Sequence, residues 1–349
     1  MRRILGIVLG ILLIGGATAV ALLKGPGSDG TATKTVRGVI GSEKSEFFRD
    51  PDVVKALVNK GYTVKTETSG SWAMDQLALK EIEAAAGVKG AQTTKPFYSP
   101  IVVIARANAA KVLADNGLAK MTGKSAGTLL MGPFLKAAAE DRNWQQLSGS
   151  ADHAELTGRV YIKTTDPATS NSGALFLAAT SNVANNGNVV ADAAAVNQVA
   201  PLMRKLISVQ GALEPSSDDP FRAFISGSGE PLILVYESQV AAMLLQQQNP
   251  GDMVVLYPDT TVNSAHTFVP LTEQAKELGT LLATDPKLRE LAVRHGFRPQ
   301  DGVADFTAAT APHAAHLNPG LTGIRQVGTP TVKILMVLAQ RSKGQGDTP

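Results

Sequence analysis

The alternation of strand-like and helix-like segments is the feature that most constrains how this chain folds. From Thr35 onward, apolar or alternating runs such as 36–40, 62–66 and 231–236 precede segments whose apolar residues recur at helical spacing. Strands that alternate with helices usually form parallel sheets, because each connecting helix crosses back over the sheet. The sequence therefore predicts an α/β fold in which each sheet is mostly parallel and covered by helices.

Two of the predicted helices begin and end with the same residue types. Asp50 and Asp285 each precede a proline, and a glycine follows each apolar stripe, at Gly61 and Gly296. An aspartate side chain accepts hydrogen bonds from the first helical N–H groups, and proline suits the first helical position. Glycine adopts the left-handed conformation that commonly ends a helix. Both helices are therefore predicted with defined starts and ends.

Composition excludes several classes of protein. The chain has 349 residues, of which 44% are hydrophobic and 18% charged, which is enough for two lobes. The net charge of +3 comes from interspersed residues, and only 5% of residues are aromatic, so a nucleic-acid surface is not expected. There are no cysteines, which excludes disulfides, thiolate metal sites, a cysteine nucleophile and a lipid-modified cysteine anchor.

The amino terminus predicts a location outside the cytoplasm. Arg2 and Arg3 precede an uncharged run at residues 4–23, which is long enough to span a bilayer. One interpretation is a signal peptide cleaved at the small residues 17–19, and the other is an uncleaved single-pass anchor. Because the run stays apolar up to Lys24, we favour the anchor. Residues 1–33 would then comprise the anchor and a flexible linker, with the main domain extracytoplasmic at the cell membrane.

Four polar turns follow predicted strands, and they indicate a ligand site. The turns lie at 42–45, 69–71, 170–172 and 237–238. Ligands of open α/β sheets bind at the carboxyl ends of the strands, where such turns would converge. The turn at 170–172 follows a predicted strand at 158–163 and leads into a helix, whose first N–H groups favour an anion. The alternative is that its residues only cap the helix.

Short motifs in this chain resemble the type II periplasmic solute-binding proteins, especially the phosphate-, sulfate- and molybdate-binding branch. The segments that carry the resemblance are 39–44, 69–71, 98–105, 165–173, 235–238 and 254–258. The resemblance implies two α/β lobes joined by two crossover segments, with a small polar, anionic ligand held between them for a membrane permease. It also implies oxyanion contacts from Ser42, Ser69, Ser71, Ser170, Asn171 and Ser172.

The complete predicted ligand-binding set is larger than these six residues. It comprises Ser42, Glu43, Lys44, Ser69, Gly70, Ser71, Ser170, Asn171, Ser172, Tyr236 and Glu237. Lys44 is expected to pair either with Glu43 or with the charge of the ligand. One lobe is predicted from 34–105 plus 258–340 and the other from 106–257, with crossovers at the strands near Pro100 and Asp252. Residues 341–349 are predicted to be a disordered tail.

Enzyme and sensor alternatives have weaker support in the sequence. His313 and His316 have a spacing that two metal ligands can use, but no carboxylate lies nearby, so no metal site is predicted. Glu43 and Glu237 would form a carboxylate pair for hydrolysis if they faced each other across the cleft. We predict no catalytic residues and no cofactor. A tethered sensor or interaction module of the same fold remains the alternative function.

Overall fold

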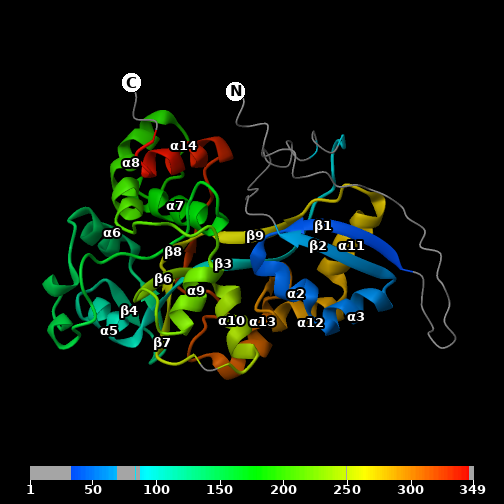
Figure 1. The fold of residues 1–349 in the computed structure, drawn as a ribbon, viewed down its shortest axis with the longest axis horizontal. Helices are drawn as coiled ribbons and strands as arrows, with labels where there is room; N and C mark the ends of the chain where they lie inside the picture. The colour runs from blue at the N-terminus through cyan, green and yellow to red at the C-terminus, as the bar shows by residue number, and fades with distance from the viewer. Residues whose placement is uncertain (1–32, 69–82, 84–86, 249, 346–349) are drawn as a thin grey trace.

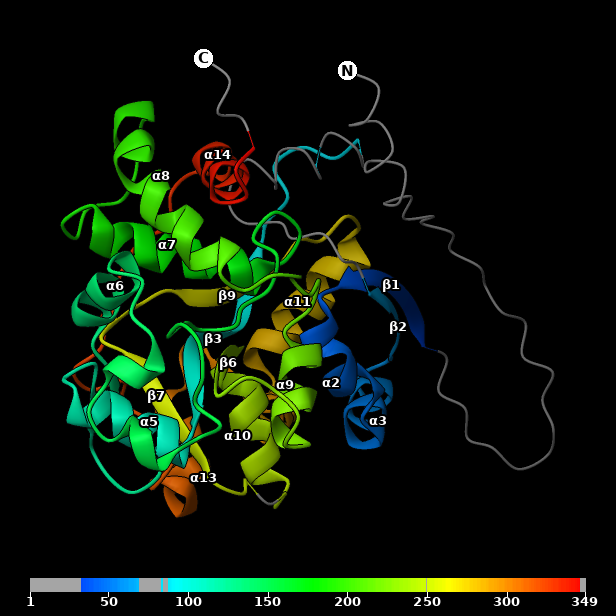
Figure 2. The ribbon, with the colours of Figure 1, turned by 60° about the vertical axis from the view of Figure 1, so that its left-hand side comes forward.

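The protein folds into two lobes that lie side by side. The computed structural model describes residues 33–68, 83, 87–248 and 250–345. The amino-terminal strands, drawn in blue, lie in one lobe, and the green helices lie in the other (Figure 1). A view turned by 60° keeps the two groups apart (Figure 2). We call the lobe that contains the amino-terminal strands the first lobe, and its neighbour the second lobe.

The first lobe is built on a pair of parallel strands. Its elements are β1 (Lys34–Ile40), η1 (Ser42–Lys44), α2 (Ser45–Arg49), α3 (Pro51–Asn59), β2 (Tyr62–Thr68), α11 (Glu273–Thr284) and α12 (Pro286–Arg294). Phe47, Leu57, Leu278 and Leu291 belong to one buried cluster that joins these elements. Segments from both ends of the chain therefore share one core, although more than 200 residues separate them.

The predicted starts of α3 and α12 are confirmed. The Asp50 carboxylate accepts hydrogen bonds from the backbone N–H of Asp52 at 2.7 Å and of Val53 at 3.4 Å. Asp285 does the same for the N–H groups of Lys287 and Leu288. Each aspartate thus satisfies donors that would otherwise lack a partner at the helix start.

Asp50 also links α3 to the end of α12, and this link is expected to make stability depend on pH. Its carboxylate contacts Arg294 Nη2 at 2.7 Å and His295 Nε2 at 2.8 Å. Burial alone would raise the pKa of Asp50, but the hydrogen bonds with His295 and Arg294 outweigh it and lower the pKa from 3.8 to about 2. A carboxyl group with a lowered pKa stabilises the fold above its ordinary pKa, and that contribution is lost as pH falls through about 2.

We therefore expect Asp50→Asn to remove an acid-sensitive part of the stability. In urea unfolding at pH 7, the free energy of unfolding should fall by about 1 kcal/mol or more, because the charged cap and its contacts are lost. Between pH 4 and pH 2, the parent protein should lose more stability than the variant does. An equal loss in both proteins over this interval would show that Asp50 is not the responsible group.

The long strand β3 (Thr94–Arg106) runs from one lobe into the other. Residues 94–100 pair with β9 (Asn263–Phe268), and the end of the strand, residues 101–106, pairs with β6 (Leu232–Tyr236) and β7 (Met253–Pro258). In Figure 1, β3 and β9 cross the space between the groups of helices. β3 and the β7–β9 segment therefore connect the lobes as two antiparallel passes.

The prediction of mostly parallel sheets is wrong. Among the described residues, β3 is antiparallel to β6, β7, β9 and the short β10 (Arg298–Pro299). Parallel pairing joins β1 to β2, β5 (Ala126–Leu129) to β7, and the short β8 (Thr260–Thr261) to β11 (Arg325–Gln326). Periodicity along a segment shows which side chains are buried, but it carries no information on the direction of the partner strand.

The second lobe holds most of the helices. Its elements are α5 (Ala107–Asp115), β4 (Ala119–Met121), β5, α6 (Met131–Ala139), η2 (Trp144–Gln146), η3 (Ser150–Asp152), α7 (Asn171–Ala184), α8 (Ala193–Ser208), α9 (Asp218–Ile225), β6, α10 (Glu237–Leu245) and β7. Farther along the chain, α13 (Val303–Thr310) and η4 (Ala311–His313) follow β10. The predicted strand at 158–163 does not form a regular strand, and only isolated bridges at Arg159 and Lys163 join it to neighbouring segments.

The last helix, α14 (Val332–Ser342), packs against α7 and α8. Leu335, Leu338 and Ala339 lie in the same buried cluster as Leu175 of α7. The sequence-based division assigns residues 258–340 to the first lobe, and the bounds of the lobes stay a prediction. The contacts of α14 lead us to propose that this helix belongs with the second lobe.

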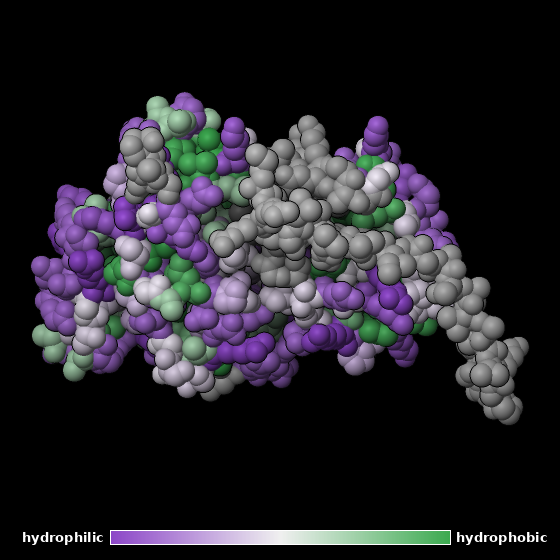
Figure 3. Space-filling view, turned by 45° about the horizontal axis from the view of Figure 1, so that its top comes forward, coloured by the Kyte–Doolittle hydropathy of each residue, from purple (hydrophilic) through white to green (hydrophobic). Residues whose placement is uncertain are grey.

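The described surface is mostly hydrophilic. Figure 3 shows purple residues over most of the described part of this face, with green patches between them. The large exposed apolar side chains come from separate elements, namely Val39, Val54, Val189, Ile225, Val303 and Met336. No helix among the described residues is long and apolar enough to cross a membrane. The predicted anchor at 4–23 lies outside these residues, as do residues 346–349 of the predicted tail, whereas Arg341 and Ser342 belong to α14 and are not disordered.

Candidate functional site

Polar side chains from both lobes meet where the lobes face each other. We call this group the interlobe cluster, and its members are Ser42, Glu43, Lys44, Asn171, Tyr236, Ser264 and His266. The Ser42 hydroxyl lies 3.1 Å from that of Ser216, which belongs to the loop before α9. The charge of Glu43 in η1 acts on Tyr236 at the end of β6. Ser42 therefore brings η1 to the loop before α9, and Tyr236, which the Glu43 charge affects, accepts a hydrogen bond from Asn171 at the start of α7.

Asn171, the first residue of α7, joins two other elements of the cluster. Its amide Nδ2 donates to the Tyr236 hydroxyl and to Ser264 Oγ, both at 3.0 Å. Tyr236 ends β6, whereas Ser264 lies on β9, one of the two passes between the lobes. The amide group thus fixes the start of α7 relative to two strands.

The hydroxyls of the turn before α7 bond to one another rather than to the helix backbone. Ser172 Oγ lies 2.8 Å from Thr165 Oγ1 and 3.2 Å from Ser170 Oγ, and all three residues are buried. Ser170 is the N-cap residue, but its side chain makes no capping hydrogen bond. The alternative that these hydroxyls only cap the helix is therefore wrong for Ser170. Their burial means that they support Asn171 from behind.

Tyr236 remains protonated at neutral pH. Burial raises the pKa of its hydroxyl, and the nearby Glu43 carboxylate raises it further. Hydrogen bonds with Asn171, Ser172 and Ser264 offset only part of these effects. The cluster therefore contains a neutral phenol that can both donate and accept hydrogen bonds.

Lys44 pairs with Glu43. The Lys44 ammonium donates a hydrogen bond to the Glu43 carboxylate, and the two side chains are 20% and 13% exposed. Of the two partners that the sequence allowed for Lys44, the structure shows the intramolecular one. The pair leaves one charge of each sign at the face of the first lobe that meets Tyr236.

His266 belongs to the cluster but was not predicted from the sequence. It is buried on β9, on the same side of the strand as Ser264, and it packs against Phe97 and Phe297 with ring centroids 5.2 and 5.1 Å away. Neither ring nitrogen has a hydrogen-bond partner among the described residues. Burial and the positive charge of Lys44 hold the pKa of His266 well below its ordinary value, so the ring is neutral.

An unpartnered buried imidazole is costly, and it therefore suggests a missing partner. Leaving a buried polar group without a hydrogen bond costs about 1–3 kcal/mol. A ligand or water bound beside the ring would supply hydrogen bonds to its two nitrogens. The sequence does not indicate that His266 is buried, because the burial of a strand residue depends on the elements that pack against the strand.

Glu237 faces away from the cluster. Its side chain is fully buried, its carboxylate binds Arg298 through two hydrogen bonds of 2.5 and 2.7 Å, and it accepts a third from the Tyr257 hydroxyl. Both carboxylate oxygens are therefore engaged, and Glu237 cannot contact a ligand between the lobes. This geometry also removes the carboxylate pair with Glu43 that a hydrolase would require.

Three further residues of the predicted ligand-binding set, Ser69, Gly70 and Ser71, lie outside the described residues. Within the described ranges, no group of three or more His, Cys, Asp or Glu side chains is placed to hold a metal ion.

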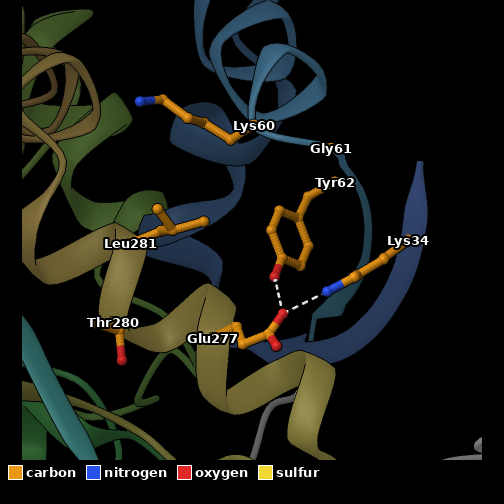
Figure 4. A pocket seen from close by; sticks show the side chains of 7 residues that line it. All are labelled: Lys34, Lys60, Gly61, Tyr62, Glu277, Thr280 and Leu281. Atoms are coloured by element: carbon orange, nitrogen blue, oxygen red, sulfur yellow. Dashed lines mark hydrogen bonds and ion pairs between the residues drawn. The ribbon is translucent and has the colours of Figure 1, made fainter. Parts of the chain in front are cut away.

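A separate hollow lies on the first lobe, away from the interlobe cluster. It has a volume of about 570 Å³ and is lined by Lys34, Lys60, Gly61, Tyr62, Glu277, Thr280 and Leu281. In Figure 4, the Glu277 carboxylate contacts both Lys34 and the Tyr62 hydroxyl, at 2.5 and 2.6 Å. Lys34 and Glu277 pair with each other, Lys60 pairs with Asp285, and none of the lining residues comes from the second lobe, so we do not assign the ligand to this hollow.

The comparisons with known proteins identify a fold but no sequence family. No family model and no curated protein matches the chain. The chain is similar to the GacH receptor of Streptomyces glaucescens GLA.O, at 11% identity, with a TM-score of 0.51 over 90% of this chain and 94% of that one. It is also similar to maltose-bound T. maritima MalE3, at 11% identity, with a TM-score of 0.52 over 89% and 96% of the two chains.

These similarities show that the protein has the two-lobed α/β fold of the type II, or ABC, solute-binding proteins. The structural neighbours are binding proteins rather than enzymes. The phosphate-, sulfate- and molybdate-binding branch is not specifically supported. PstS from Borrelia burgdorferi matches at 11% identity over 76% of this chain and 98% of that one, but its TM-score of 0.38 carries no argument.

Proposed function

We propose that this protein captures a small polar, anionic ligand between its two lobes and delivers it to a membrane transporter. The observation that carries this proposal is the interlobe cluster, in which Ser42 of the first lobe contacts Ser216 of the second and the charge of Glu43 acts on Tyr236. The nitrogens of His266, which have no hydrogen-bond partner among the described residues, also support a ligand at this cluster. The fold supports the proposal as well, because the GacH receptor is described in complex with acarbose and MalE3 with maltose.

The start of α7 favours an anion. Lys44 provides a positive charge that its partner Glu43 balances, and α7 directs its amino-terminal end toward the cluster at Asn171. The helix dipole makes that end positive, and no side chain caps it. A hydrogen bond to a charged group contributes about 1.5–3 kcal/mol, so a few such contacts give micromolar binding.

A ligand screen on the purified full-length protein tests the proposal. Melting temperature should be measured with inorganic oxyanions, organic acids, amino acids and sugars, because a ligand that binds only the folded state raises it. Solution scattering with the ligand that raises it should show compaction if the lobes close. If only uncharged sugars raise the melting temperature, the anion assignment is wrong; if no compound does, the proposed function fails.

We also propose that residues 4–23 anchor the protein in the membrane, with the two lobes outside the cytoplasm. The support is the uncharged run after Arg2 and Arg3. Sequencing the amino terminus of the mature protein is expected to show that this run is retained. A mature protein that starts near Val20 would mean that the segment is a cleaved signal peptide.

A further inference from the structure

The segment between α8 and α9, residues 210–217, lies along the turn that leads to α7. We call this segment the strap. The backbone N–H of Thr164 donates to the side-chain oxygen of Gln210 at 2.7 Å, and the N–H of Asp166 donates to the Glu214 carbonyl at 2.9 Å. These hydrogen bonds hold the first part of the strap against the second lobe.

The end of the strap reaches the first lobe. Ser216 Oγ lies 3.1 Å from Ser42 Oγ, and both serines are partly exposed. Ser216 Oγ also accepts a hydrogen bond from the backbone N–H of Asp218 at 3.2 Å, so its own proton is available to donate to Ser42. Because the pair is uncharged and partly exposed, water can replace either partner when the contact breaks.

Further hydrogen bonds connect this contact to the interlobe cluster. Asp218, the first residue of α9, accepts from Gln239 Nε2 at 2.9 Å. Gln239 Oε1 in turn accepts from the backbone N–H of Tyr236 at 3.0 Å, and the Tyr236 hydroxyl accepts from Asn171. One chain of hydrogen bonds therefore runs from the contact with the first lobe to the start of α7.

Building on the proposed function, we propose that the strap is a latch between the lobes. Ser216 holds Ser42 when the lobes lie together, and this hydrogen bond breaks before a ligand enters or leaves the space between them. Ser42 was predicted to contact the ligand, whereas in this role its hydroxyl holds the lobes closed. A neutral hydrogen bond changes an equilibrium by about twofold to tenfold, so the latch opens without the help of another molecule.

Ser216→Ala is expected to raise the hydrogen-exchange rate of η1 in the full-length protein by about twofold to tenfold, because more molecules are open at any time. η1 belongs to the first lobe, so a change confined to the strap would leave its exchange unaltered. Ser226→Ala is the matched control. Ser226 is exposed at the other end of α9, and its hydroxyl contacts Ala223 and Ser228 of its own turn.

A disulfide that replaces the serine contact tests whether the latch controls ligand exchange. The chain has no cysteine, so Ser42→Cys combined with Ser216→Cys introduces the only thiols. Under oxidation this pair should cross-link faster than Ser42→Cys with Ser226→Cys, as measured by mass spectrometry, because α9 separates Ser226 from the strap. In titration calorimetry with sulfate, succinate and maltose, the oxidised protein should lose the binding that its reduced form shows.

Each contrary result overturns a defined part of the inference. Equal cross-linking rates for the two cysteine pairs, or unchanged exchange of η1 in Ser216→Ala, would show that Ser216 does not hold the first lobe. An oxidised protein that binds a probe as its reduced form does would show that the latch does not control ligand entry. If none of the three probes binds to the parent or to the reduced protein, control of ligand entry fails together with the proposed function, whereas the exchange and cross-linking results still decide the contact itself.

Discussion

Replacing Arg298 with alanine is expected to lower the free energy of unfolding by about 3–5 kcal/mol, as is usual when one partner of a buried ion pair is removed. Arg298 is 1% exposed and forms two hydrogen bonds with Glu237. Burial would lower the pKa of Arg298, but the contact with Glu237 outweighs it and raises the pKa. Without Arg298, the Glu237 carboxylate would remain buried with Tyr257 as its side-chain partner.

The guanidinium also ties a loop to the core, which adds to the expected loss. Arg298 donates to the backbone carbonyls of Asn318 at 2.9 Å and Pro319 at 2.5 Å, and it lies 4.2 Å from the centre of the Phe306 ring. These contacts fix the segment after α13 against α10, so truncation affects more than the ion pair.

Urea unfolding of matched variants distinguishes this mechanism from a general effect of losing an arginine. Arg289 pairs with Asp305 at 2.8 Å, but the Asp305 side chain is 53% exposed. Arg289→Ala should therefore cost less than about 1 kcal/mol. Replacing Glu237 and Arg298 together with Leu and Met should cost less than Arg298→Ala, because no unpaired buried charge remains. Similar losses in both single variants would contradict the assignment of a special role to Arg298.

Replacing Lys44 with methionine is expected to weaken binding of an anionic ligand by about tenfold to a hundredfold. Lys44 contributes the positive charge of the interlobe cluster, and one charge-assisted hydrogen bond is worth about 1.5–3 kcal/mol. Methionine keeps the length and the apolar part of the side chain, so the fold should be retained. The loss should appear in the dissociation constant, and the melting temperature without ligand should change little.

Lys55→Met provides the control for the net charge. Lys55 is exposed on α3, so its replacement removes the same charge at a site that does not face the second lobe. Binding measured by titration calorimetry at low ionic strength should be unaffected in this variant. If Lys55→Met and Lys44→Met weaken binding equally, Lys44 acts only through the overall charge and does not contact the ligand.

The sequence predicted where the polar turns lie better than it predicted which residues belong to the site. It predicted the polar turns at η1 and at the start of α7, and in the structure both relate to Tyr236, which accepts a hydrogen bond from Asn171 and whose pKa the Glu43 charge raises. It also placed Glu237 in the site, although this residue follows β6 directly and points to Arg298 instead. Whether the side chain after a strand faces the ligand or the core depends on the elements that cover it.

Helix starts, helix ends and buried stripes could be derived from the sequence because they arise from interactions within a few residues. Asp50 caps its helix through N–H groups two and three residues away. Strand direction and the interlobe contacts could not be derived, because they join distant segments: Glu237 and Arg298 are 61 residues apart, Asn171 and Ser264 are 93 apart, and Ser42 and Ser216 are 174 apart. Only the packing of the complete chain decides which of many equally polar side chains become neighbours, and here it left His266 buried without a hydrogen-bond partner among the described residues.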